Sequence, residues 1–247
     1  MKAIASRKDF HFIIVVMAAL IMMAGYGCGD DDDEFVVGDA RVRAIHLSSD
    51  APPVDIFVNG QEPAAVTNLA FGNSTPYIDD VEPGSYTFNI AAAPGTPAQS
   101  VLDVGPLALM GGTAYTAVAF NTLAAPIEAL ALVDNLSSPG SGNIRLRPIH
   151  AAPDVAQVDI WEVSDPQNPA LLYEDVNFRD VEAYKNLPAG TYTLGFDVNN
   201  DLTPDLTFST GAIPAGSILN VFAVNDGADV FLIAQFQDGS TAQIDPM

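Results

Sequence analysis

The sequence is poor in cysteine, histidine and basic residues. Its single cysteine excludes an internal disulfide and any metal site built from several cysteines. Nine basic residues stand against 31 acidic ones, and the formal charge of −22 makes nucleic acid a poor partner because like charges repel. Neither a Gly-rich phosphate loop nor a His-Glu-x-x-His motif is present. The 18 prolines and 19 glycines are spread along the chain, which is typical of many short turns rather than long helices.

The N-terminal segment has the layout of a secretory signal. Lys2, Arg7 and Lys8 precede an uncharged run over residues 12–23. This run is too short for the roughly 20 apolar residues of a membrane-spanning helix. It fits the roughly 7–15 residues of a signal-peptide core. We therefore interpret residues 1–27 as a signal peptide that is removed from the mature chain.

The sole cysteine, Cys28, directly follows this segment and resembles the acylated cysteine of bacterial lipoproteins. Of the three positions before it, Gly27 fits the lipoprotein pattern best. The alternative is an ordinary secretory signal in which Cys28 is an incidental thiol. Residues 28–39 contain the acidic run Asp30–Glu34, which like-charge repulsion keeps extended, and they would act as a tether. We expect a lipid-anchored protein of the bacterial cell envelope, and Gly29 in place of aspartate favours the outer membrane over the inner.

An internal repeat divides the rest of the chain. The segment Arg43-Ala-Ile-His46-Leu-Ser-Ser-Asp50 returns 104 positions later as Arg147-Pro-Ile-His150-Ala-Ala-Pro-Asp154. Val-Asp-Ile-Phe at 54–57 returns as Val-Asp-Ile-Trp at 158–161. Further matches follow with offsets that drift only between the matched blocks. They indicate two copies of one domain, over residues 40–137 and 143–247, joined by a Ser/Pro/Gly linker at 138–142.

Each copy is predicted to be all-β. Short β-branched or aromatic runs alternate with turn residues, and about seven such runs in about 100 residues are typical of a sandwich. Tyr86, Phe88 and Ile90 point to one side of their run, while Thr87 and Asn89 point to the other. We therefore expect two tandem immunoglobulin-like or transthyretin-like β-sandwich domains. A partly open barrel is the alternative for each copy.

The openings of the two copies resemble a known family. Residues 40–60 and 147–154, with the later Gly-x-Tyr-Thr element, are similar to the domain-of-unknown-function 4397 family, DUF 4397. The resemblance covers nearly the whole mature chain as two tandem repeats. It implies a bacterial envelope protein, since such domains often stand in tandem behind a lipoprotein signal. It implies no established activity.

The most specific polar set recurs in both copies, as Arg43, His46, Asp50 and Asp55 and then as Arg147, His150, Asp154 and Asp159. A histidine close to an aspartate could serve acid–base chemistry. A serine nucleophile is available in the first copy only, as Ser48 or Ser49, because the second copy has alanine and proline there. We therefore expect the set to be structural and to fix the turn after the first strand. A hydrolase and a weak metal or ligand site are the alternatives.

A second candidate is a calcium loop in the second copy. Oxygen-bearing side chains stand close together at Asp197, Asn199, Asp201 and Asp205. Leu202 occupies the place where such loops have glycine, and Phe208 occupies the twelfth position, where they have an acid. The sequence thus predicts a weak calcium site, with a polar hairpin loop as the alternative. No other cofactor is expected.

Phe57 and Trp161 occupy matched positions and form a third candidate. By alternation, Phe57 shares a sheet face with Asp55, and Trp161 shares one with Asp159. An exposed aromatic ring beside a carboxylate is what a sugar-binding surface would use. The alternative is that both rings cover a second sheet or the contact between the domains.

Together these features favour a non-catalytic, membrane-anchored extracytoplasmic protein whose tandem modules serve binding, adhesion or envelope structure. Its partners would be the membrane, through the lipid, and an unknown protein or carbohydrate. The alternatives are a His/Asp-based hydrolase and a calcium-stabilised carbohydrate-binding protein. Burial of His46 and His150 in matching surroundings would favour the structural role of the repeated polar set.

Overall fold

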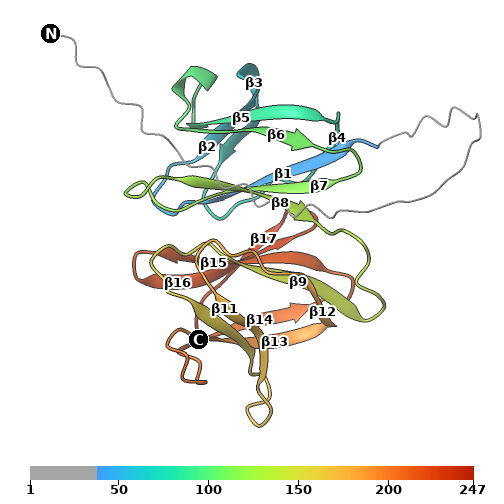
Figure 1. Ribbon diagram of the computed structural model, residues 1–247, viewed down its shortest axis with the longest axis vertical. Helices are drawn as coiled ribbons and strands as arrows, with labels where there is room; N and C mark the ends of the chain where they lie inside the picture. Colours follow the sequence, from blue (N-terminus) through green and yellow to red (C-terminus); the bar gives the residue numbers. More distant parts are fainter. Residues whose placement is uncertain (1–37) are drawn as a thin grey trace, which may run out of the picture.

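The computed structural model describes residues 38–247 (Figure 1). The predicted signal peptide, Cys28 and nearly all of the predicted tether lie outside this range. Over the described range the chain is almost entirely β-strand, and one short 3-10 helix, η1 (Pro97–Gln99), follows β5. Within residues 38–247, no helix has the length and apolar character needed to cross a membrane.

The first sandwich consists of two four-stranded sheets. One has the order β4 (Ile78–Val81), β1 (Ala40–Leu47), β7 (Ala114–Phe120) and β8 (Glu128–Asp134). The other has the order β3 (Gln61–Leu69), β2 (Val54–Val58), β5 (Gly84–Ala92) and β6 (Leu102–Leu109). The pairing of β1 with β7 is parallel, and the remaining pairs are antiparallel.

The second sandwich repeats this topology. One sheet has the order β12 (Lys185–Pro188), β9 (Asn143–His150), β15 (Ile218–Asp226), β16 (Asp229–Phe236) and β17 (Thr241–Ile244). The other has the order β11 (Ala170–Val176), β10 (Val158–Glu162), β13 (Gly190–Asp197) and β14 (Leu206–Ile213). The pairing of β9 with β15 is again parallel, as that of β1 with β7 is. The all-β sandwich prediction is confirmed.

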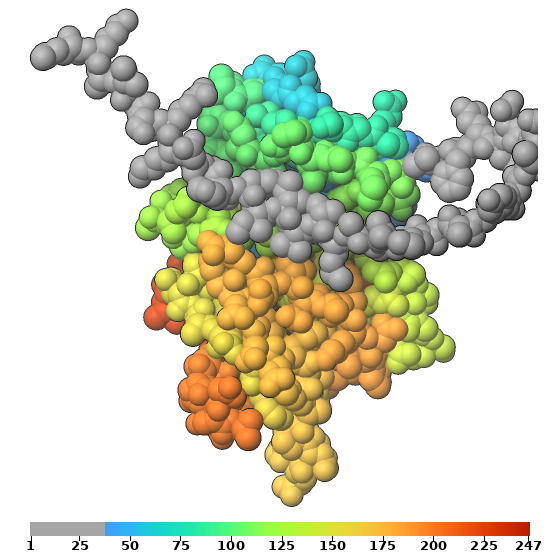
Figure 2. All heavy atoms as spheres, in the orientation of Figure 1, coloured from blue at the N-terminus to red at the C-terminus, as the bar shows by residue number. Residues whose placement is uncertain are grey.

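The two sandwiches lie against each other (Figure 2), and the sheets that contain β1 and β9 face each other (Figure 1). A single buried apolar cluster joins them, with Ile45, Leu47, Val118, Phe120 and Leu132 from the first and Ile149, Ala151, Phe222, Val224, Phe231 and Ile233 from the second. Val118 and Phe222 occupy matched positions, because each pairs with the matched isoleucine of the first strand. Two residues later in each strand the sizes are reversed, because the first sandwich has the large Phe120 and the second has the small Val224. The contact is therefore a shared core rather than two surfaces in loose contact.

The cores inside the two sandwiches differ. The second sandwich has one continuous cluster of 15 buried apolar residues. In the first sandwich the buried apolar residues form two smaller clusters, one that includes Val54 and Ile90 and one that includes Leu107 and Tyr115. The first sandwich therefore lacks part of the packing that its copy has.

Candidate functional site

His46 and His150 lie at the ends of β1 and β9 in the same surroundings. Their exposed fractions are 2% and 1%. The Nε2 atom of His46 is 3.1 Å from the carbonyl oxygen of Pro52, and that of His150 is 3.1 Å from the carbonyl oxygen of Ala156. Matched phenylalanines, Phe71 and Phe178, meet the two rings edge-on.

The second ring nitrogen fixes the protonation state of each histidine. The backbone amide of Ser48 donates to Nδ1 of His46 at 3.3 Å, and that of Ala152 donates to Nδ1 of His150 at 3.3 Å. Because Nδ1 accepts, the proton must lie on Nε2, which donates to the carbonyl. Burial lowers the pKa of both rings below the ordinary value of 6.5, and the carbonyl acceptors offset only part of this effect. Both rings are therefore held neutral inside a turn.

Mild acid should destabilise the protein through these two rings. The unfolded chain takes up protons below pH 6.5, whereas the folded state resists protonation. Stability is therefore full above that pH and falls as the pH drops below it, by at most about 1.4 kcal/mol per pH unit for each ring. Urea denaturation of the wild type at pH 7.5, 6.5 and 5.5 measures the slope, and the double variant His46→Gln, His150→Gln is the control. An equal slope in both proteins would contradict this assignment.

The four repeated aspartates bind backbone and side-chain donors close to the histidine turns. Asp55 accepts the amide of Asn68 at 2.8 Å, and Asp159 accepts that of Asp175 at 2.7 Å. Both donor residues have positive φ and lie where the ladder to β2 or β10 changes register. Each carboxylate thus stabilises a bulge in a neighbouring strand. In the first sandwich Asp50 accepts the backbone amide of Leu123, in the loop after β7, and in the second Asp154 accepts the side-chain amide of Asn225, near the end of β15.

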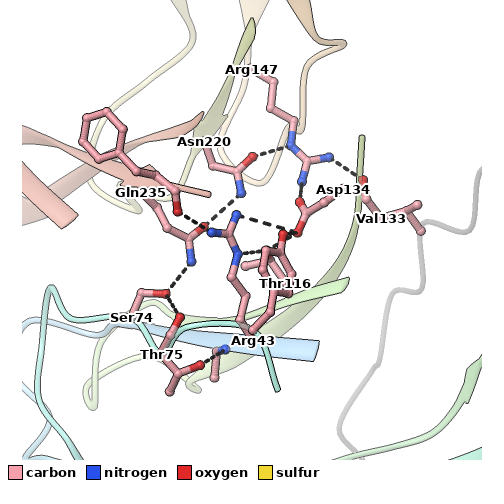
Figure 3. A network of polar contacts seen from close by, with 12 residues as sticks. Arg43, Ser74, Thr75, Thr116, Val133, Asp134, Arg147, Asn220 and Gln235 are labelled. Atoms are coloured by element: carbon pink, nitrogen blue, oxygen red, sulfur yellow. Dashed lines mark hydrogen bonds and ion pairs between the residues drawn. The ribbon is translucent and has the colours of Figure 1, made fainter. Parts of the chain in front are cut away.

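Arg43 and Arg147 meet between the sandwiches, around the single carboxylate of Asp134 (Figure 3). Nη2 of Arg147 is 2.5 Å from Oδ1 of Asp134, and Nη2 of Arg43 is 3.7 Å from Oδ2. Each guanidinium also reaches across the interface to a main-chain carbonyl. Nη1 of Arg43 donates to the oxygen of Phe236 at 2.5 Å, and Nη1 of Arg147 donates to that of Val133 at 2.9 Å.

Other side chains complete this group of residues, which we call the arginine cluster (Arg43, Arg147, Asp134, Tyr77 and Tyr184). Within each sandwich the arginine Nε donates at 2.8 Å to a matched residue of the parallel strand, Thr116 or Asn220. Each guanidinium carbon lies 4.5 Å from the centre of a tyrosine ring, Arg43 over Tyr77 and Arg147 over Tyr184.

The arginine cluster carries two positive charges and one negative charge in a buried place. The hydroxyl of Tyr77 donates to Asp134 at 2.5 Å. Burial, and then the charge of Asp134, raise the pKa of Tyr77, and burial raises that of Tyr184 to about 12. Both phenols are therefore neutral donors at physiological pH, and the excess positive charge is spread over ring faces and carbonyl oxygens. The cluster holds the two sandwiches in one arrangement.

Comparison with known proteins found one family model that matches part of the chain. Residues 40–161 match the model of a domain of unknown function, DUF4397. A search of curated proteins found no relative. A solved structure titled "Alpha-glucan binding by a streptococcal virulence factor" is similar over 74% of this chain and 92% of that chain, with 11% sequence identity and a TM-score of 0.24.

The DUF4397 match contains much of the site described above. It spans the whole first sandwich, continues through β9 of the second and ends within β10. It therefore includes both histidine turns, both arginines and Asp134. Asp134 is the functional residue that the sequence analysis missed. One acid at the end of the apolar run of β8 was the signal that could have drawn attention to it.

The predicted calcium loop, which lies beyond the DUF4397 match, is organised by its own backbone. Both carboxylate oxygens of Asp197 accept backbone amides, from Asn200 at 2.8 Å and Leu202 at 2.7 Å among others. Burial raises the pKa of the Asp197 carboxyl, but these amides lower it by more, so it lies below its ordinary value. Asp205 accepts the amide of Val198, and Asp201 accepts that of Thr203. Over the described part of the chain, no three His, Cys, Asp or Glu side chains are grouped to hold a metal ion. The calcium site stays a prediction, and in this structure the carboxylates of Asp197, Asp201 and Asp205 accept backbone amides of their own loop.

The two aromatic residues of the repeat differ in exposure. Val54, Ile56 and Val58 point into the first sandwich, so Phe57 and Asp55 lie on the opposite face of β2, as predicted. However, the exposed fraction of Phe57 is only 2%, so no open ring is available there. Trp161, the last residue of the DUF4397 match, is partly exposed and lies opposite Leu171, which is 41% exposed. Of these two matched rings, only that of Trp161 is therefore accessible.

Proposed function

We propose that the protein is a lipoprotein of the bacterial cell envelope, anchored through Cys28, whose paired β-sandwiches form a non-catalytic module for binding or envelope structure. The non-catalytic part of this proposal rests on the two histidines, whose ring nitrogens make the same hydrogen bonds in both sandwiches. A general base needs a ring nitrogen that faces its substrate, whereas His46 and His150 each use both nitrogens within their own turn. The repeated aspartates also serve local structure rather than a common cleft.

The absence of catalysis by the histidines can be tested directly. The wild type should give no turnover in a screen of generic esterase, glycosidase and peptidase substrates. His46→Ala and His150→Ala should each lower the free energy of unfolding by about 1–3 kcal/mol, because each leaves buried partners without a hydrogen bond. Thermal melts of both variants measure the loss. Turnover that disappears on substitution, with unchanged melting, would instead establish a hydrolase.

Anchoring is tested at the only thiol in the sequence. Cys28→Ala should release the protein from the membrane fraction or leave an unprocessed precursor, because acyl chains on Cys28 would provide the attachment. Membrane fractionation and gel migration of the two proteins, expressed in a bacterial host, read the result. His11→Ala, a change within the predicted signal peptide, is the matched control and should fractionate like the wild type. A Cys28→Ala variant that does the same would remove the anchor from the proposal.

The partner that we propose is an envelope protein or a carbohydrate. The partly exposed ring of Trp161 beside Leu171 is the surface that favours such a contact. A pull-down from native envelopes with the mature chain, compared with the same experiment on Trp161→Ala, would identify the partner and test this surface together.

A further inference from the structure

The first sandwich encloses an apolar cavity of about 150 Å³ between its two sheets. The corresponding space in the second sandwich is about 20 Å³. The larger cavity lies between the two separate apolar clusters of the first core, and both clusters contribute to its lining. Well-packed interiors contain few voids larger than a water molecule, so a cavity of this size in only one of two copies requires an explanation.

The explanation lies in matched core positions where the first copy has smaller side chains. Val66 pairs with Ile56 as Tyr173 pairs with Ile160, and Val104 pairs with Phe88 as Phe208 pairs with Leu194. By the same strand registers, Ala129 corresponds to Leu232 and Ala117 corresponds to Val221. The four smaller residues line the cavity, and their four larger counterparts belong to the continuous core of the second sandwich. Ile90, which also lines the cavity, likewise corresponds to the larger Phe196, so smaller side chains at matched positions account for the space.

The lining determines the chemistry of a possible guest. Its polar members are few, and two of them, Arg43 and His46, have their nitrogens bound to groups elsewhere. A buried water needs two to four polar partners, whereas an apolar cavity stays dry. A charged or strongly hydrogen-bonding ligand would lose its hydration without compensation. The cavity therefore suits an uncharged apolar molecule.

The position of the cavity also offers access. Two of its lining residues, Ala65 on β3 and Ile78 on β4, lie on edge strands and are exposed, Ile78 by 42%. An edge strand is paired on one side only, so these two strands are the ones that can separate locally with the loss of fewest hydrogen bonds. A guest would not need to cross the shared core between the sandwiches.

We propose that the first sandwich is a binding site for a small uncharged hydrocarbon of about the size of benzene. A dry apolar cavity of about 150 Å³ is known to hold benzene or xenon in an engineered protein. This site is independent of the anchor at Cys28 and of the Trp161 surface. If no hydrocarbon binds in the cavity, the proposed envelope function still stands. If Cys28 carries no lipid, the cavity is unchanged.

The experiment uses the mature chain with benzene as the probe and phenol as its polar counterpart. At about ten times the dissociation constant, benzene should raise the melting temperature by about 3–5 °C, and phenol should raise it less. Amide NMR shifts should change around Val66 and Val104 rather than around their counterparts in the second sandwich. No shift of the wild type with benzene, or shifts confined to the second sandwich, would overturn the proposal.

The second sandwich supplies the residues for matched variants. Val104→Phe and Ala129→Leu introduce the side chains found at the corresponding positions, and both should abolish the response to benzene. Ala129→Leu adds less volume, so it provides the test by itself if the Val104→Phe protein does not fold. Phe208→Val makes the reverse change and should give the second sandwich a response of its own. An undiminished benzene response in a folded Ala129→Leu protein would overturn the proposal.

Discussion

Replacing Asp134 with alanine should lower the free energy of unfolding by about 3–5 kcal/mol, because removing one partner of a buried ion pair leaves uncompensated charge. Here two guanidinium groups would remain buried between the sandwiches without a carboxylate. The variant would also remove the acceptor of the Tyr77 hydroxyl. Urea denaturation followed by circular dichroism at neutral pH measures the loss.

An exposed ion pair provides the control for this prediction. Arg41 and Asp79 are 2.8 Å apart, but about half of each side chain is exposed. Asp79→Ala should therefore cost no more than about 1 kcal/mol. A triple variant, Asp134→Leu with Arg43→Met and Arg147→Met, should recover much of the loss, since apolar replacement of a buried ionic group is often neutral. If Asp134→Ala costs as little as Asp79→Ala, the arginine cluster does not stabilise the interface.

Replacing Phe222 with alanine should cost a similar amount, about 3–5 kcal/mol, by leaving a cavity in a packed core. Phe222 is fully buried and belongs to the apolar cluster that both sandwiches share. Because that cluster joins the two halves, the loss should destabilise both together. The fluorescence of Trp161 reports on the second sandwich, and far-UV circular dichroism reports on both.

The unfolding curves from these two probes should coincide in the wild type, as expected for one cooperative unit. The surface variant Val101→Ala, at a position that is 62% exposed, is the control and should change stability by no more than about 0.5 kcal/mol. A loss below about 1 kcal/mol for Phe222→Ala, or separate transitions in the wild type, would show that the sandwiches do not share a core.

The repeated sequence blocks predicted most of the fold, because they contain the central strands. The strands that the sequence did not predict are β4, β12 and β17, each of four residues. They lie at sheet edges, where one side of the strand has no partner, and they carry charged or polar residues and proline that disguise a β pattern. The sequence therefore predicted the longer strands, including edge strands such as β3 and β8, but not the shortest edge strands.

The candidate site was predictable only where the two copies agree. His46 and His150 were expected to have a structural role because the duplication keeps them while changing the neighbouring serines. The position matched to Asp134 holds Gln237, so comparison of the copies residue by residue could not reveal it. The acids of the 197–205 loop suggested calcium because sequence spacing shows which oxygens are near, but not which amides they bind.

The shared carboxylate of Asp134 has a consequence for how the duplicated halves can evolve. A symmetric pair would place the same patch on both sides of its interface, yet here one acid serves two arginines, and the exchange of valine and phenylalanine at 118, 120, 222 and 224 fits only one partner to the other. The two sandwiches therefore resemble the two different subunits of a heterodimer, joined in a single polypeptide chain. A half that is excised or duplicated again would keep an arginine or an apolar face without its complement, so recombination should move the two sandwiches together.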